Sequence, residues 1–201
     1  MGSYTAISDA GKTIVEFLRK NCVPPIEKPE LIGLCSPDDT GNFILGVCLY
    51  DIEENTGLKM GRDIIVDDTH IKAPPSLLDL HYMIFTALKS DIAVRAPDEQ
   101  RILGSVYQKL ADSRVITDDL AGTLGENSES LNITFENKPY EDKIRIWTAY
   151  NLPPKQCLFY KVSGLAVDSE LVREVKRVTD ADISIRQRES HNTRGQRGQL
   201  R

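Results

Sequence analysis

The first twenty residues repeat apolar side chains at a helical spacing. These side chains recur at intervals of one helical turn along the chain: Ala6, Ala10, Ile14, Phe17 and Leu18. The pattern predicts an amphipathic helix over residues 5–20. The prolines of the following VPPIEKPE segment end this helix and hold the chain extended.

The next segments have the alternation and composition of strands. Apolar runs over residues 30–35 and 42–52 predict two strands, because the SPDDTG between them has the composition of a tight turn. The second run is apolar on both faces, which is typical of a strand at the centre of a sheet. Residues 63–68 predict a short strand. Residues 76–89 fit a helix or a long strand, and their aromatic and β-branched content favours the strand.

The clearest helical pattern lies in DIAVRAPDEQRILGSVYQKLADS. Its apolar stripe consists of Ile102, Leu103, Val106, Tyr107 and Leu110. We expect Pro97 at the first helical position, where the missing N–H is not needed. Asp98 and Glu99 would then lie in the first turn, where the helix dipole favours negative charge.

The remaining pattern predicts a strand, a short helix and two final strands. Residues 130–136 alternate, with three side chains expected on the core side: Leu131, Ile133 and Phe135. Residues 139–150 predict a helix whose apolar face holds Tyr140, Ile144 and Trp147. We expect Trp147, the only tryptophan, to be a core residue. Strands over residues 156–167 and 171–185 complete the order.

This order of elements predicts an α+β (mixed α/β) fold, with one mixed, largely antiparallel sheet flanked by about three helices. We expect one domain over residues 1–185 and a basic C-terminal arm over residues 186–201. The arm holds five arginines and one acid, for a net charge of +4. The body therefore carries −9, because the whole chain carries −5. An acidic body argues against a nucleic-acid-binding domain.

The arginines of the arm are the candidate partner-binding residues: Arg186, Arg188, Arg194, Arg197 and Arg201. Three interpretations remain open for them. The arm is a solvated end, or a partner protein orders it through arginine–carboxylate contacts, or it binds nucleic acid. The absence of aromatic residues in the arm counts against the last.

The run Gly11-Lys12-Thr13 resembles the end of a phosphate-binding loop. Such a loop needs a glycine where this chain has Ala6, and a buried strand before it. The run therefore fits the predicted helix better. A nucleotide-binding regulator or small enzyme that uses this run is the alternative function.

Other candidate chemistry is sparse, and the sequence predicts no cofactor, metal site or catalytic residue. The histidines are too widely separated for metal ligation and are expected to be exposed or half-buried: His70, His81 and His191. The cysteines form no C-x-x-C motif, and we expect reduced thiols that pack as small apolar side chains: Cys22, Cys35, Cys48 and Cys157. The acidic pairs are expected to serve turns: Asp38-Asp39, Asp67-Asp68 and Asp118-Asp119. No apolar run has the length of a membrane span, and no secretory signal is evident.

Several blocks of the chain resemble, in order, the cap protein family of extracellular contractile injection systems, the phage-tail-like particles related to the antifeeding prophage. These blocks include SYTAISDAGKTIVEFLRKN, IGLCSPDDTGNFILGVCLYDIEEN, PPSLLDLHYMIFTAL, DEQRILGSVYQKLADSRVI and IRIWTAYNLPPKQCLFYKVSGLAVDSE. The resemblance runs from about residue 3 to residue 182. Larger members of the family have an added C-terminal region, and the resemblance leads us to expect the short basic arm in its place here.

The resemblance implies a structural protein without enzymatic activity. Six copies are expected to form a ring that terminates the inner tube at the end distal to the baseplate. The implied partners are other copies of the chain, the terminal tube ring and the terminal sheath ring, with a tape-measure protein as a further candidate. No nucleic acid or membrane insertion is expected. The implied location is the bacterial cytoplasm during assembly and then the injection particle.

Overall fold

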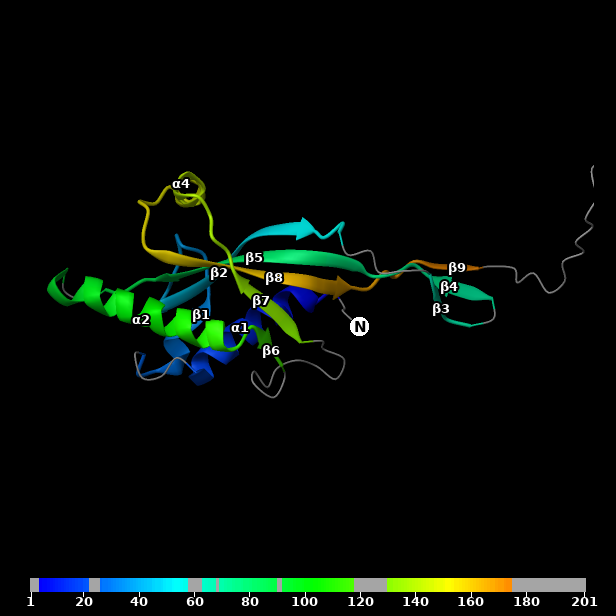
Figure 1. Ribbon diagram of the computed structural model, residues 1–201, viewed down its shortest axis with the longest axis horizontal. Helices are drawn as coiled ribbons and strands as arrows, with labels where there is room; N and C mark the ends of the chain where they lie inside the picture. Colours follow the sequence, from blue (N-terminus) through cyan, green and yellow to red (C-terminus); the bar gives the residue numbers. More distant parts are fainter. Residues whose placement is uncertain are drawn as a thin grey trace, which may run out of the picture.

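A computed structural model describes residues 4–21, 26–57, 63–67, 69–89, 92–117 and 130–174 (Figure 1). The elements in chain order are α1 (Ala6–Asn21), the 3₁₀ helix η1 (Pro29–Leu31), β1 (Ile32–Leu34), β2 (Leu45–Glu54), β3 (Ile64–Ile65), β4 (His70–Lys72), β5 (Ser76–Thr86), α2 (Ile92–Asp112), β6 (Val115–Ile116), β7 (Leu131–Phe135), α4 (Tyr140–Ala149), β8 (Cys157–Val167) and β9 (Val172–Glu174). The predicted strand at residues 76–89 and the helix at residues 5–20 are thus confirmed.

The main sheet has six strands in the order β1-β2-β5-β8-β7-β6. Only the β1–β2 pair is parallel, and the other pairs are antiparallel. Helices α1 and α2 lie on one face of this sheet, and α4 lies on the other (Figure 1). The predicted α+β class with a mixed, largely antiparallel sheet is therefore confirmed.

The larger core lies between the sheet and the two helices α1 and α2. The apolar face of α1 is buried there as predicted, with Ile14 and Leu18 at 0% exposure. From α2, Val106 and Leu110 join the same core. Burial of such aliphatic side chains contributes about 1.5–3 kcal/mol each, so this core provides most of the driving force for folding.

A smaller core forms under α4 on the opposite face. Trp147 is 1% exposed and packs edge-to-face on Phe85, with ring centroids 5.8 Å apart. Met83 and Phe159 of the central strands complete this core. The prediction that Trp147 is a core residue is confirmed.

A second sheet, β3-β4-β9, was not predicted, because the sequence pattern indicated a single sheet. It arises because strands β5 and β8 continue outward as β4 and β9 in nearly the same antiparallel register. The result is a ribbon that carries this small sheet away from the body (Figure 1). We call β3, β4 and β9 the small sheet. The end of the predicted strand 171–185 beyond residue 174 lies outside the described residues.

Expectations were wrong at Pro97, in the outer half of β2, at Phe135 and at Tyr140. Helix α2 begins at Ile92, so Pro97 lies inside it rather than at its first position. Pro97 is the sixth residue of α2, beyond the first four N–H groups that have no helical partner, so it removes one backbone hydrogen bond from the helix. Strand β2 is buried on both faces only in its first half, and residues 51–54 are exposed.

The other two errors concern aromatic residues at the ends of elements. Phe135 is 45% exposed, because it is the last residue of β7. Its ring makes T-shaped contacts with Tyr107 and Tyr160. Tyr140 is 69% exposed, because it is the first residue of α4 and extends beyond the small core. The spacing of apolar residues in the sequence does not show where the helix or strand that covers them ends.

Candidate assembly surfaces

The sequence-predicted site residues are divided between the described and undescribed parts of the chain. All five arginines of the arm, Arg186, Arg188, Arg194, Arg197 and Arg201, lie outside the described residues, so their role stays a prediction. The Gly11-Lys12-Thr13 run lies in the middle of α1, after its first turn. Gly11 packs close to Leu34, and the Thr13 hydroxyl donates to the Asp9 carbonyl oxygen at 2.8 Å. This geometry is that of a helix interior and not of a phosphate-binding loop.

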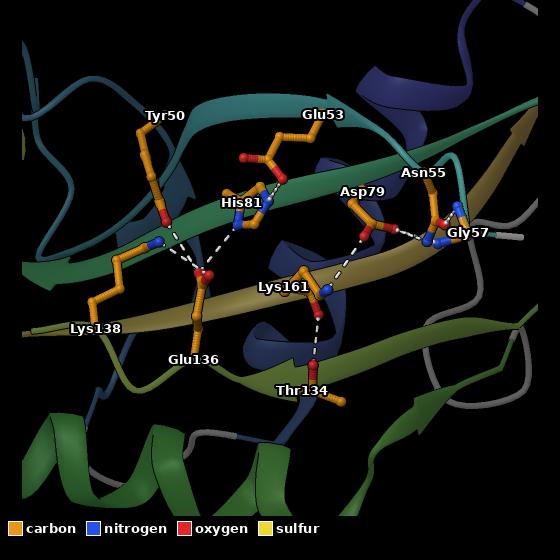
Figure 2. Close-up of polar contacts among 11 residues, drawn as sticks. Tyr50, Glu53, Asn55, Gly57, Asp79, His81, Thr134, Glu136, Lys138 and Lys161 are labelled. Atoms are coloured by element: carbon orange, nitrogen blue, oxygen red, sulfur yellow. Dashed lines mark hydrogen bonds and ion pairs between the residues drawn. The ribbon is translucent and has the colours of Figure 1, made fainter.

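A polar cluster around His81 lies on the α4 side of the sheet, beyond the end of the small core (Figure 2). Glu136 Oε2 accepts a hydrogen bond from the Tyr50 hydroxyl at 3.1 Å and lies 3.1 Å from His81 Nδ1. Lys138 Nζ donates to Glu136 Oε1 at 3.0 Å. The second ring nitrogen of His81, Nε2, lies 3.5 Å from Glu53 Oε2. We call these five residues the His81 cluster.

The electrostatics of the His81 cluster centre on the Glu136 carboxylate. Burial raises the pKa of Glu136, but hydrogen bonds from His81 and Lys138 outweigh burial and hold this pKa below its ordinary value. The pKa of Tyr50 is raised by burial and by the negative charge of Glu136. His81 is 5% exposed, so the expectation of an exposed or half-buried side chain was wrong. Strand alternation places it opposite Asp51 on β2, at a register that no local pattern reveals.

Asp79 organises a second polar contact set next to the His81 cluster (Figure 2). Asp79 Oδ1 accepts from Asn55 Nδ2 at 3.0 Å and from the Gly164 backbone N–H at 3.1 Å, and Oδ2 lies 3.2 Å from Lys161 Nζ. Burial raises the pKa of Asp79, and these three donors more than offset it, so the pKa lies below its ordinary value. Asp79 therefore links Asn55, which follows the end of β2, to β8, where the ribbon that leads to the small sheet begins.

The small sheet presents apolar side chains to solvent. Five of the exposed large hydrophobic residues of the described chain lie on it or at its ends: Ile64 39%, Ile65 77%, Val66 56%, Leu171 51% and Val172 50%. The turn between β3 and β4 is held by Asp67, whose Oδ1 accepts from the backbone N–H groups of Thr69 and His70 at 2.8 Å. The backbone N–H of Thr69, together with the His70 and Thr69 side chains, lowers the pKa of Asp67 to about 2. The turn bonds confirm the predicted turn role of this residue. So much apolar surface on a sheet of two- and three-residue strands is typical of an interaction site.

A groove lies between the first turn of α1 and the outer edge of β2. Its lining includes Tyr4, Ile7, Leu34, Leu49 and Tyr82, and we call it the β2 groove. Tyr82 is 1% exposed, and its hydroxyl has no hydrogen-bond partner among the described residues. Burial raises the pKa of this hydroxyl, so it stays protonated and able to donate. A buried donor without an acceptor is rare in folded proteins.

The described residues offer no grouping of three or more metal-ligating side chains. Cys35 and Cys48 border the β2 groove, and burial raises the pKa of both thiols, to about 11 for Cys35. Such thiols are weak nucleophiles. In the described part of the chain, no helix combines the length and apolar character that membrane crossing requires.

Comparisons with known proteins agree with this architecture. Residues 11–180 match the family described as the Pvc16 N-terminal domain. Comparison with curated proteins finds no match. Among solved structures, the sheath/tube terminator of a PVC extracellular contractile injection system, in its extended state, aligns with a TM-score of 0.59 at 18% identity. That alignment covers 92% of this chain and 64% of that chain.

The tube-terminating cap of the anti-feeding prophage aligns with a TM-score of 0.43 at 15% identity, over 71% of this chain and 49% of that chain. This chain therefore spans less than two thirds of the length of either terminator chain. At these identities the likeness to the PVC terminator concerns the fold, and it agrees with the mixed sheet and flanking helices described above.

Proposed function

Because the chain belongs to the Pvc16 N-terminal domain family, we propose that it is a structural cap protein of an extracellular contractile injection system. The observation that carries this proposal is the extent of the family match, which spans residues 11–180 and thus nearly the whole described body. The shared fold with a sheath/tube terminator supports it. The proposed role is structural and requires neither catalysis nor a cofactor.

In this proposal, six copies form a ring on the inner tube at the end distal to the baseplate. One face of the ring docks on the terminal tube ring, and the outer part engages the last sheath layer. The tape-measure protein is a further candidate partner. Head-to-tail contacts close into a ring when the rotation between neighbouring copies is a simple fraction of a turn. The exposed apolar residues of the small sheet and the open edge of β2 are surfaces suited to such contacts.

The arginine arm, residues 186–201, has a place in the same proposal. We assign residues 1–185 to the cap domain and the arm to contacts with acidic protein surfaces. The acidic body carries −9 against +4 on the arm, and arginine forks bind carboxylates in a bidentate manner. No observation on the described residues favours a nucleotide or nucleic-acid function over this one.

The location of the protein follows from the same role. It would assemble in the bacterial cytoplasm and remain part of the particle, including particles that are released from the cell.

Deletion of the gene in a producing strain tests the proposal through tube length. Without a cap, inner tubes are expected to vary widely in length and to lack a closed end, because nothing stops subunit addition. Complementation with the wild-type chain should restore a narrow length distribution. Normal capped tubes in the deletion strain would contradict the proposed function.

A second strain that produces residues 1–185 alone tests the arm separately. We expect tubes without a stable end ring, and a control with all five arginines changed to lysine should recover partly, because it keeps the charge but loses the fork geometry. Normal capping by the truncated chain would remove the arm from the proposal but not the cap domain.

A further inference from the structure

The outer half of β2 is an open strand edge. Strand β1 pairs with β2 only as far as Val47, and the last bond of this ladder runs from the Cys35 N–H to the Val47 carbonyl oxygen. Among the described residues, no strand pairs with this edge of β2 between Leu49 and Glu54. In Figure 1 this half of β2 is the cyan arrow, which runs on well beyond β1. Open edges of this kind pair readily with an added strand.

The two faces of this edge differ in character. Asp51 and Glu53 lie opposite His81 and Asp79, so their side chains are on the polar, α4 side of the sheet. Leu49 lies opposite Tyr82, and Ile52 lies opposite Leu80, so they are on the α1 side, where Leu49 and Tyr82 line the apolar part of the β2 groove. A strand that continues the line of β1 would therefore meet carboxylates on one face and an apolar groove on the other.

The buried Tyr82 hydroxyl is an independent sign that something completes this groove. It is a donor with no partner among the described residues, and it lies in the lining of the groove. An added backbone beside β2 would supply carbonyl oxygens, which are the acceptors this hydroxyl lacks.

One segment of the chain has the matching alternation. In the sequence ISIRQR, residues 183–188, the side chains of Ile183 and Ile185 fall on one face of a strand, and those of Arg186 and Arg188 fall on the other. The two arginines have the same spacing as Asp51 and Glu53. Opposite charges at facing positions stabilise a strand pair. These residues lie outside the described part of the chain, and the argument rests on their sequence alone.

The direction of the chain points to a second copy as the donor of this segment. Strand β9 continues the course of β8 away from the body and ends at Glu174 (Figure 1). Residues 175–182 contain no glycine or proline, the residues that most often reverse a chain. Their eight residues can span about 26 Å when extended.

We propose that residues 183–188 of one copy add as a strand to the open edge of β2 in a second copy, with Arg186 and Arg188 against Asp51 and Glu53 and with Ile183 and Ile185 over the β2 groove. This inference rests on the proposed function only for the expectation that copies of the chain assemble. Repeated around a ring, it is a head-to-tail contact that links each copy to the next.

Photo-crosslinking between isotopically distinct copies tests the proposal. The full-length chain would carry benzoylphenylalanine in place of Gln187, and equal amounts of ¹⁵N-labelled and unlabelled chains would be mixed before irradiation. We expect crosslinks from position 187 to residues 49–54 and to the groove lining, with half of them joining a labelled to an unlabelled chain. No crosslinks to this region, or crosslinks only within one chain, would overturn the proposal.

Charge reversal gives a second readout on the same material. The paired change Asp51→Lys with Glu53→Lys, and separately Arg186→Glu with Arg188→Glu, should each reduce the crosslink yield at least about tenfold, since like charges then face each other. A mixture of the two variants should recover the yield between copies. The matched control, Glu30→Lys with Glu141→Lys, changes exposed acids away from the groove and should crosslink like the wild type.

Each result separates this inference from the proposed function. Failure of the mixture to recover would overturn the pairing, even if the chain still caps the tube. Recovery in a chain that does not sit at a tube end would support the pairing and contradict the cap role.

Discussion

Replacement of Glu136 by alanine should destabilise the fold through its buried neighbour His81. Glu136 is the acceptor shared by His81, Tyr50 and Lys138. The His81 ring is 5% exposed, and a buried polar group that loses its partner costs about 1–3 kcal/mol. Tyr50 and Lys138 are partly exposed, so water replaces their lost bonds and each adds at most about 0.5 kcal/mol.

The expected loss is therefore about 2 kcal/mol of the free energy of unfolding, or a fall of about 4–8 °C in Tm for a chain of this size. Urea unfolding of the wild type and of Glu136→Ala measures it, with Glu141→Ala on the exposed surface of α4 as the matched control. The control should stay within about 0.5 kcal/mol of the wild type.

A double-mutant cycle measures the interaction energy between Glu136 and His81. Glu136→Ala and His81→Ala should be coupled by at least about 0.5 kcal/mol, because the two residues are in direct contact. A Glu136→Ala variant as stable as the Glu141→Ala control, or a coupling of zero, would refute the reasoning that this cluster holds the outer part of the sheet together.

Three further predictions follow from the same structure. Because the folded-state pKa values of Glu136 and Asp79 lie below their ordinary values of 4.5 and 3.8, their contribution to stability is complete above that range and is lost as the pH falls through the folded values; thermal unfolding between pH 7 and pH 3 should show this loss, and a Glu136→Gln, Asp79→Asn variant should lose less stability than the wild type, the remainder coming from other carboxylates with lowered pKa values such as Asp67. Tyr82→Phe removes a hydroxyl with no partner among the described residues, so the isolated chain should be as stable as the wild type or slightly more stable, and a loss above about 1 kcal/mol would show that the hydroxyl is already paired within the monomer. Trp147→Ala empties most of the small core and should cost about 3–5 kcal/mol by urea unfolding, whereas a cost below about 1 kcal/mol would mean that α4 does not depend on this anchor.

Much of the fold follows from local patterns in the sequence. The helical spacing of Ile14, Phe17 and Leu18 predicts α1 because its period alone defines a buried face. The strand β5 and the burial of Trp147 follow from composition in the same way. The patterns fail where a covering element ends, as at Phe135 and in the outer half of β2, since solvent exposure there depends on which distant segment lies above.

The candidate surfaces were mostly invisible in the sequence. The arginines of the arm stand out by composition, but the His81 cluster joins residues as far apart as Tyr50 and Glu136, which only the strand order brings together. The β2 groove depends on β1 being short, and the small sheet depends on the ribbon that β5 and β8 continue. Long-range register, unlike helical period, leaves no local signal.

The position of the chain in the particle is the measurement that tests the central claim most directly. Electron cryomicroscopy of purified, uncontracted particles should place the body of this fold in a single ring at the tube end distal to the baseplate, in contact with the last tube and sheath layers. Density for this chain along the length of the tube, at the baseplate, or absent from capped particles would contradict the account.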